Sequence, residues 1–194
     1  MRTVKLNRKT KETDIRVELN LDGDGKSQIK TGIGFFDHML TLFSNHSMVD
    51  MALNAKGDLE VDDHHTIEDI GFVLGQAFDK ALAERKGINR YGFCVLPMDE
   101  ALAQVAIDLG GRPFLQFEAD FSREKVGEMS TELVYDFFDA FCRGCKANIS
   151  IRLLAGRNDH HKIESIFKAF ARAMRMACEL DPRQKRIPST KGVL

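Results

Sequence analysis

The chain has 194 residues, of which 43% are hydrophobic and 29% charged, the composition of a globular protein with its own core. Lysine and arginine (28) nearly balance aspartate and glutamate (29), which argues against nucleic-acid binding through bulk positive charge. No apolar run approaches the ~20 residues of a membrane span, and residues 1–13 are too polar for a secretion signal. Four cysteines are too few for a disulfide scaffold. We therefore expect a cytoplasmic protein without nucleic-acid or membrane partners.

The predicted elements form two similar series along the chain. In the first, residues 15–21 and 28–30 are predicted strands joined by a hairpin turn at 22–25, followed by a helix over 35–45 and a strand over 51–57. An amphipathic helix then begins at His64. In the second series, a helix over 131–145 and a strand over 148–156 precede an amphipathic helix that begins at His160. The aspartate before each histidine pair is the predicted N-cap.

A repeated motif explains why the two series look alike. Residues 63–70 read D-H-H-T-I-E-D-I and residues 159–166 read D-H-H-K-I-E-S-I, so six of eight positions are identical at an offset of 96 residues. This offset is close to half of the chain, which predicts an internal duplication with halves of about 1–92 and 93–194. Since no linker rich in proline, glycine or serine separates the halves, we expect one domain over 1–194.

The spacing within each motif favours a metal site. Residues i and i+4 share one face of a helix, so Glu68 lies near His64 and His65, whereas the two imidazoles diverge. Each H-H-x-x-E unit is therefore expected to serve two different metal ions, and the two copies to build two similar sites. Imidazole and carboxylate ligands without thiolate suit Mn, Fe or Zn. A histidine pair can also simply cap a helix, but two copies with the same Asp and Glu favour metal binding.

Basic residues near the second motif indicate an anion site. Lys168 follows Glu164 by one helical turn and begins a basic stripe. Such residues usually form a solvated face, but a cation beside metal ligands is suited to a phosphate group of a metal-bound substrate. Arg90 and Arg112 lie in loop segments that contain glycine, where functional residues concentrate.

In this order along the chain, the motifs resemble those of the imidazoleglycerol-phosphate dehydratase family of histidine biosynthesis. The resemblance is carried by residues 11–13, 34–40, 62–69, 87–92, 97–102, 111–113, 156–164 and 187–194. It implies an internally duplicated α/β fold of the ribosomal protein S5 domain 2-like type, with helices packed against two four-stranded sheets. It also implies a hydro-lyase that converts D-erythro-imidazole glycerol 3-phosphate into imidazole acetol phosphate through an imidazolate and a diazafulvene-type intermediate. Two Mn(II) sites per subunit, no organic cofactor and a 24-subunit shell are further implications.

The resemblance also assigns roles to individual residues. Family metal ligands match His38, His64, His65, Glu68, Asp136, His160, His161 and Glu164, and the position of Asp136 is a histidine in many members. Substrate-binding positions match Glu12, His38, His46, Arg90, Asp99, Arg112, Lys168, Ser189 and Lys191. Proton transfer is expected from Glu12, Glu164 and Glu68. Glu12 takes the larger part because a carboxylate that is bound to a metal is a weak base.

Two alternative functions from other classes share these residues. A dinuclear metal hydrolase, such as a phosphoesterase, would release inorganic phosphate, whereas the dehydratase keeps the phosphate on its product. A metal-storage or metal-assembled shell protein would need the histidines and glutamates for assembly, but would not need the basic residues Arg90, Lys168 and Lys191.

Overall fold

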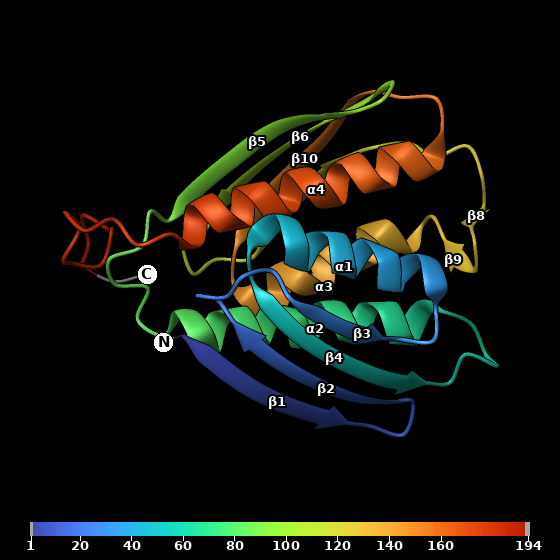
Figure 1. The fold of residues 1–194 in the computed structure, drawn as a ribbon, viewed down its shortest axis with the longest axis horizontal. Helices are drawn as coiled ribbons and strands as arrows, with labels where there is room; N and C mark the ends of the chain where they lie inside the picture. The colour runs from blue at the N-terminus through green and yellow to red at the C-terminus, as the bar shows by residue number, and fades with distance from the viewer. Residues whose placement is uncertain (1, 193–194) are drawn as a thin grey trace.

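A computed structural model describes residues 2–192 and contains two four-stranded sheets with four helices between them (Figure 1). The first half comprises β1 (Thr3–Lys9), β2 (Thr13–Asn20), β3 (Ser27–Lys30), α1 (Gly34–Ser47), β4 (Asp50–Gly57) and α2 (His64–Leu82). The second half comprises β5 (Tyr91–Met98), β6 (Ala101–Asp108), β7 (Phe114–Glu118), β8 (Lys125–Val126), β9 (Met129–Ser130), α3 (Leu133–Cys145), β10 (Asn148–Ala155) and α4 (Asp159–Cys178). No helix among the described residues is both long and apolar enough to cross a membrane.

The two sheets have the same topology. Their strand orders are β1-β2-β4-β3 and β5-β6-β10-β7, and in each sheet the last pair is parallel while the others are antiparallel. Each parallel pair is joined through a helix, α1 in the first half and α3 in the second, because parallel strands need a crossover connection. The expectation of a duplicated α/β fold with two four-stranded sheets is confirmed.

The predicted hairpin at residues 22–25 is wrong. β2 and β3 are not neighbours, since β4 lies between them and pairs with both. The turn is fastened to the start of β4 instead, where Asp50 Oδ1 accepts hydrogen bonds from the backbone N–H groups of Asp24 and Lys26, each at 2.9 Å. A glycine-rich turn between two short strands is typical of a hairpin, but here the crossover through α1 decides which strands pair.

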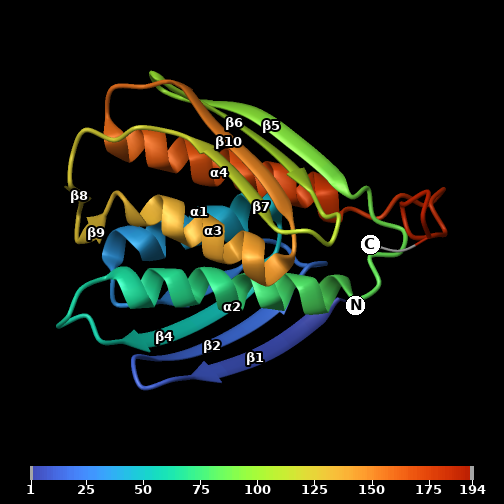
Figure 2. The same cartoon turned by 180° about the vertical axis from the view of Figure 1, so that it is seen from behind.

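The helices of the two halves share one core. α1 packs against α4, and α2 packs against α3, so each helix pair joins the first half to the second (Figures 1 and 2). Aromatic rings fill this interior: Phe36, Phe43, Phe78, Phe137, Phe138, Phe141, Phe167 and Phe170 are all fully buried. On the sheets, alternate residues such as Ile15 and Val17 of β2 face inward and are buried, as expected for a sheet with one covered face.

α2 and α3 approach each other closely because small residues line their contact. A Cβ atom at Gly75 of α2 would overlap the carbonyl oxygen of Phe141, and one at Gly144 of α3 would overlap the carbonyl oxygen of Phe72. Only glycine leaves room for the opposite backbone at these two positions. The contact fixes how the first motif, at the start of α2, faces α3.

We expect Gly75→Ala and Gly144→Ala each to lower the free energy of unfolding by about 1–3 kcal/mol, because an added methyl group must push the two backbones apart. Chemical denaturation monitored by circular dichroism measures this change. Gly34→Ala is the matched control, since no atom lies within 4 Å of a Cβ atom added there. Equal stability of all three variants would contradict the close approach of α2 and α3.

Candidate metal centre and anion site

Three polar side chains from both halves meet at the start of α4. His160 and Glu164 lie one turn apart on α4, and His38 reaches them from α1. Glu164 Oε2 lies 3.1 Å from His160 Nε2 and 3.4 Å from His38 Nε2. One donor atom from each residue lies within 4.8 Å of the other two. Two imidazoles and one carboxylate that converge in this way fit a divalent metal ion such as Mn, Fe or Zn.

Glu164 is an ionised carboxylate held by a neighbouring cation. Glu164 is only 6% exposed, and burial by itself raises the pKa of a carboxyl group. Lys168 opposes this effect, since its Nζ lies 2.5 Å from Glu164 Oε1. The hydrogen bond and charge of Lys168, with hydrogen bonds from the two histidines, leave the pKa of Glu164 below its ordinary value. Glu164 is therefore charged at neutral pH and suited to binding a cation through Oε2.

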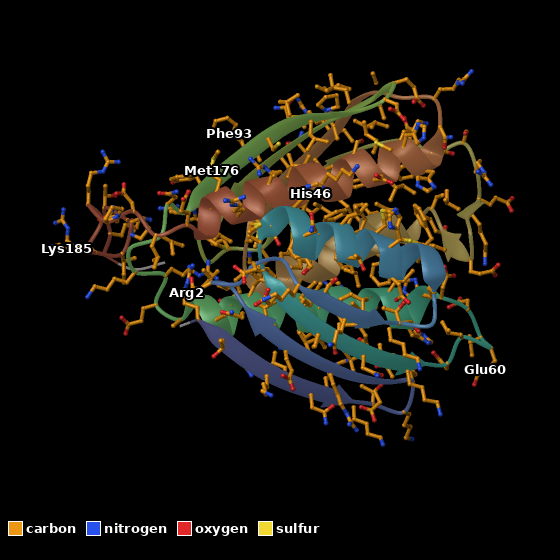
Figure 3. The ribbon with its side chains drawn as sticks, viewed as in Figure 1. Arg2, His46, Glu60, Phe93, Met176 and Lys185 are labelled. Carbon is orange, nitrogen blue, oxygen red and sulfur yellow. The ribbon has the colours of Figure 1, made fainter. Side chains whose placement is uncertain are left out.

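His46 lies in the last turn of α1, beside α4 (Figure 3). Burial lowers its pKa, and the positive charges of Lys168 and Arg172 lower it further. His46 is therefore neutral at pH 7 and has one ring nitrogen that accepts and one that donates a hydrogen bond.

The first motif has a different arrangement. His64 Nε2 and Glu68 Oε2 are 3.7 Å apart, and Glu68 Oε1 accepts a hydrogen bond of 2.6 Å from Arg143 of α3. Asp136 of α3 occupies the place that His38 has on α1, and burial raises the pKa of its carboxyl group. Within residues 2–192, the cluster around Glu164 is the one set of three donor groups that converge. The two halves therefore share the topology of their four-stranded sheets but differ in the side-chain geometry of their motifs.

The second histidine of each pair points away from the first. The ring planes of His64 and His65 are inclined at 79°, and those of His160 and His161 at 83°. His65 Nδ1 lies 3.0 Å from Asp58 Oδ2, and this hydrogen bond raises the pKa of His65. The divergence of the paired imidazoles agrees with the helical spacing.

His161 has a similar partner in the turn between β5 and β6. Its Nδ1 lies 2.8 Å from Glu100 Oε2, and this contact raises the pKa of His161 and lowers that of Glu100 to about 2. Asp58 and Glu100 were not predicted from the sequence. Asp58 lies in the connection from β4 to α2, seven residues before His65, whereas the pairing of β6 with β10 brings Glu100 beside His161.

Two predicted substrate residues lie near these second histidines. Glu12 is in the turn between β1 and β2, and its negative charge contributes to the raised pKa of His65. Asp99 Oδ2 lies 3.8 Å from His161 Nε2. Both strand turns therefore bring a carboxylate towards a motif.

A basic cavity of about 1450 Å³ lies at the other end of α4. The cavity is formed by the segments before β5 and after β6 and by residues 184–192. It collects Arg90, Arg112, Ser189 and Lys191, the residues that, with Lys168, the family resemblance assigns to binding the phosphate group of the substrate. The Arg90 guanidinium is held by Asp108, at 2.7 and 3.1 Å, and by the carbonyl oxygen of Pro188 at 2.8 Å. Figure 3 shows Lys185, which also lines the cavity, at this end of the molecule.

Within one chain, the basic cavity and the Glu164 cluster are far apart. The backbone N–H of Arg90 bonds to the carbonyl oxygen of Ala177, near the end of α4, whereas His160 is in the first turn. The helical rise of ~1.5 Å per residue separates His160 from Ala177 by roughly 25 Å. Of the predicted anion-binding residues, the structure thus brings Lys168 to the cluster but leaves the other four at the opposite end.

Comparisons with known proteins decide the family. The family model described as imidazoleglycerol-phosphate dehydratase matches residues 31–174. The chain belongs to this family of hydro-lyases. An imidazoleglycerol-phosphate dehydratase from Caldicellulosiruptor bescii is 55% identical over 193 residues, which cover 100% of this chain and 98% of the relative. The resemblance seen in the sequence is thereby confirmed.

Solved structures of the dehydratase family have the same fold. The Staphylococcus aureus enzyme superposes with a TM-score of 0.84 at 42% identity and covers 92% of this chain and 99% of its own. The Pyrococcus furiosus enzyme, in complex with (S)-C348, superposes with a TM-score of 0.83 at 36% identity and covers 97% and 100%.

In this member of the dehydratase family, one of the two predicted N-caps, Asp159, is wrong by one residue. Asn158 caps α4, since its side chain accepts a hydrogen bond from the backbone N–H of His160. Asp62 accepts in the same way from His64 at 2.8 Å. Asp159 is already the first residue of α4. Asp63 does occupy the N-cap position of α2, as predicted, but its side chain makes no capping hydrogen bond.

The motif aspartates, Asp63 and Asp159, accept hydrogen bonds from the segment between β7 and α3 instead. Asp159 Oδ2 accepts hydrogen bonds from the backbone N–H groups of Ser122 and Arg123, at 2.8 and 2.7 Å, and Asp63 accepts from the backbone N–H of Ser130 at 2.6 Å. Burial opposes the charge of Asp159, but these hydrogen bonds and that of Lys162 lower its pKa to about 2. One segment thus ties the starts of α2 and α4 together.

We expect Asp159→Asn to lower the free energy of unfolding at pH 7 by about 1.5–3 kcal/mol, because charge-assisted hydrogen bonds are lost from a buried site. The folded-state pKa of Asp159 lies below its unfolded value near 3.8. This contribution to stability is therefore complete above about pH 4 and is lost as the pH falls towards 2. Thermal unfolding across this range should show the gap between parent and variant closing.

The exposed Asp24, which contacts Lys26, offers a control in Asp24→Asn. This control should leave stability nearly unchanged at every pH. A gap for Asp159→Asn that stays constant down to pH 2 would rule out the buried charge as its cause.

Proposed function

We propose that the chain removes water from D-erythro-imidazole glycerol 3-phosphate to give imidazole acetol phosphate, a step of L-histidine biosynthesis. The observation that carries this proposal is the convergence of His38, His160 and Glu164, with Lys168 beside them, in a chain of the dehydratase family. The histidines and carboxylate suit a metal ion that binds an imidazole, and the lysine suits a phosphate group.

The proposal includes two Mn(II) ions per subunit and no organic cofactor. The cluster around Glu164 would hold one ion. The remaining ligands would come from His64, His65, Glu68, Asp136 and His161. Bound Mn(II) would act as a Lewis acid that withdraws charge from the imidazole ring of the substrate.

The chemical difficulty is that the proton on C2 of the substrate side chain is a poor acid. Loss of the ring N–H proton gives the imidazolate. The imidazolate expels the C3 hydroxyl group, which takes up a proton and leaves as water. The resulting diazafulvene loses its C2 proton more easily, and the enol that forms tautomerises to the ketone. We assign the proton transfer in these steps mainly to Glu12, because Glu12 lies in an exposed turn beside the first motif, outside the Glu164 cluster. Glu164 and Glu68 are further candidates.

We also propose that the complete site is shared between subunits of a 24-subunit shell. The separation of roughly 25 Å between the Glu164 cluster and the basic cavity supports this. One small substrate cannot bridge that distance, so Arg90, Arg112, Ser189 and Lys191 would bind the phosphate at the cluster of a neighbouring subunit. A cytoplasmic location is part of the proposal and is consistent with four cysteines in the thiol form.

The deciding experiment is an assay with imidazole glycerol phosphate on chelated protein, with and without Mn(II), in which imidazole acetol phosphate and inorganic phosphate are followed together. We expect product to form only when Mn(II) is returned, and no inorganic phosphate to appear. Glu12→Gln should reduce turnover at least a hundredfold while its Mn(II) content stays that of the parent, since general acid–base catalysis contributes on the order of 10²–10⁴-fold.

Other outcomes would assign a different function. Release of inorganic phosphate would indicate a phosphoesterase. Formation of neither imidazole acetol phosphate nor inorganic phosphate would indicate a metal-storage or structural shell. Near-normal turnover of Glu12→Gln would remove Glu12 from the mechanism.

The shared site predicts complementation between two inactive variants. Glu164→Gln disables the cluster and Arg112→Met the basic cavity, so each variant alone should be inactive. Co-expressed chains that assemble at random should recover about a quarter of the parent activity, because that fraction of shared sites receives an intact cluster and an intact cavity. Co-expression of Glu164→Gln with His160→Gln is the control and should recover nothing, since both changes damage the same cluster. Equal inactivity of both mixtures would contradict sites between subunits.

A further inference from the structure

The second histidine of each motif is held by a carboxylate that the duplication does not explain. Asp58 follows β4 and contacts His65, whereas Glu100 lies in the turn between β5 and β6 and contacts His161. The connection after β10, residues 156–158, is shorter and holds no carboxylate. The same contact is therefore built twice from unrelated parts of the chain, which indicates that the contact itself is needed.

The chemistry of this contact fixes the histidine in one form. An ionised carboxylate only accepts hydrogen bonds, so the Nδ1 atom that faces it must carry the proton. In a neutral imidazole the other nitrogen, Nε2, then has a free lone pair, and the ring cannot turn without losing the hydrogen bond. At His161 the Nε2 atom lies on the side of Asp99, at 3.8 Å, in the turn that brings predicted substrate contacts to the motif.

Asp58 has no evident structural task apart from His65. Its Oδ1 atom is buried and, among the described residues, has no hydrogen-bond partner, so its Oδ2 atom bonds to His65 while the other oxygen stays unsatisfied. A buried carboxylate oxygen without a partner costs free energy. Glu100 differs, because its Oε1 atom also accepts from the backbone N–H groups of Asn158, at 2.8 Å, and Arg157, at 3.3 Å.

We propose that Asp58 and Glu100 are positioning residues that hold His65 and His161 with Nδ1 protonated and Nε2 directed to a metal ion. This inference rests on the metal sites of the proposed function and adds the two carboxylates that prepare them. Carboxylates behind metal-binding histidines orient the ring and increase its basicity, and their loss typically weakens metal binding 10–100-fold.

The test is a Mn(II) titration of the chelated full-length protein, with free Mn(II) measured by electron paramagnetic resonance. We expect Asp58→Ala and Glu100→Ala each to raise the dissociation constant of at least one Mn(II) ion per chain 10–100-fold. Asp58→Asn and Glu100→Gln should recover part of this loss, because the amide oxygen still accepts a hydrogen bond from Nδ1 but lacks the charge. These two conservative variants also keep the test valid if the alanine variants fold poorly.

Asp62→Asn is the matched control for Asp58. It removes one negative charge near His65, and its amide oxygen can still accept the hydrogen bond from the backbone N–H of His64. It should change the dissociation constant less than threefold. Thermal unfolding of the metal-free variants reports any purely structural effect separately.

Three results would overturn the inference: unchanged Mn(II) affinity in Asp58→Ala and Glu100→Ala, an equal loss in Asp62→Asn, or no recovery in the two amide variants. A parent protein that binds no Mn(II) would instead refute the metal sites of the proposed function. The two failures are thus distinguishable.

Discussion

The site depends on helix packing between the two halves of the chain. α1 packs against α4 and α2 against α3, with a continuous cluster of buried phenylalanine rings between them. His38 reaches His160 and Glu164 only because of this arrangement, since each half alone has its motif on one helix and lacks the partner helix that supplies the third ligand. The same interior holds α2 against α3 at glycine positions, where the backbones nearly touch. The burial of apolar rings is therefore also what brings the polar ligands together.

Much of the fold could be predicted from the sequence because the repeat is strong. The helix predicted over 35–45 lies within α1, and the strand predicted over 148–156 extends one residue beyond β10. The hairpin at residues 22–25 could not be judged correctly, because strand pairing depends on the crossover through α1 rather than on the turn itself. The N-cap of α4 was missed by one residue, and Asp63 at the N-cap of α2 makes no capping hydrogen bond, for a similar reason: the motif aspartates bind Ser122 and Ser130, which are far away in sequence.

The candidate site was predictable in its residue types but not in its asymmetry. Helical spacing places His160 near Glu164, and it places His64 near Glu68 in the same way. The differences come from the neighbouring helix, where His38 joins one motif while Arg143 engages the carboxylate of the other. Contacts of this kind join residues that no local pattern relates. The roles of the remaining predicted residues, including Glu12, Asp99 and Lys191, stay predictions.

The packing of α1 against α4 and of α2 against α3 also bears on how the two halves of the chain arose. If a single half-length chain once formed this structure, two identical copies would have exchanged helices across a two-fold axis, and symmetry would have forced both sites to be the same. Fusion of two copies into one chain would have removed that constraint. His38 and Asp136 at corresponding places, and Lys168 and Phe72 at another such pair, show what the fused chain was then free to do. The duplication preserved the scaffold, and the loss of symmetry gave each motif its own surroundings.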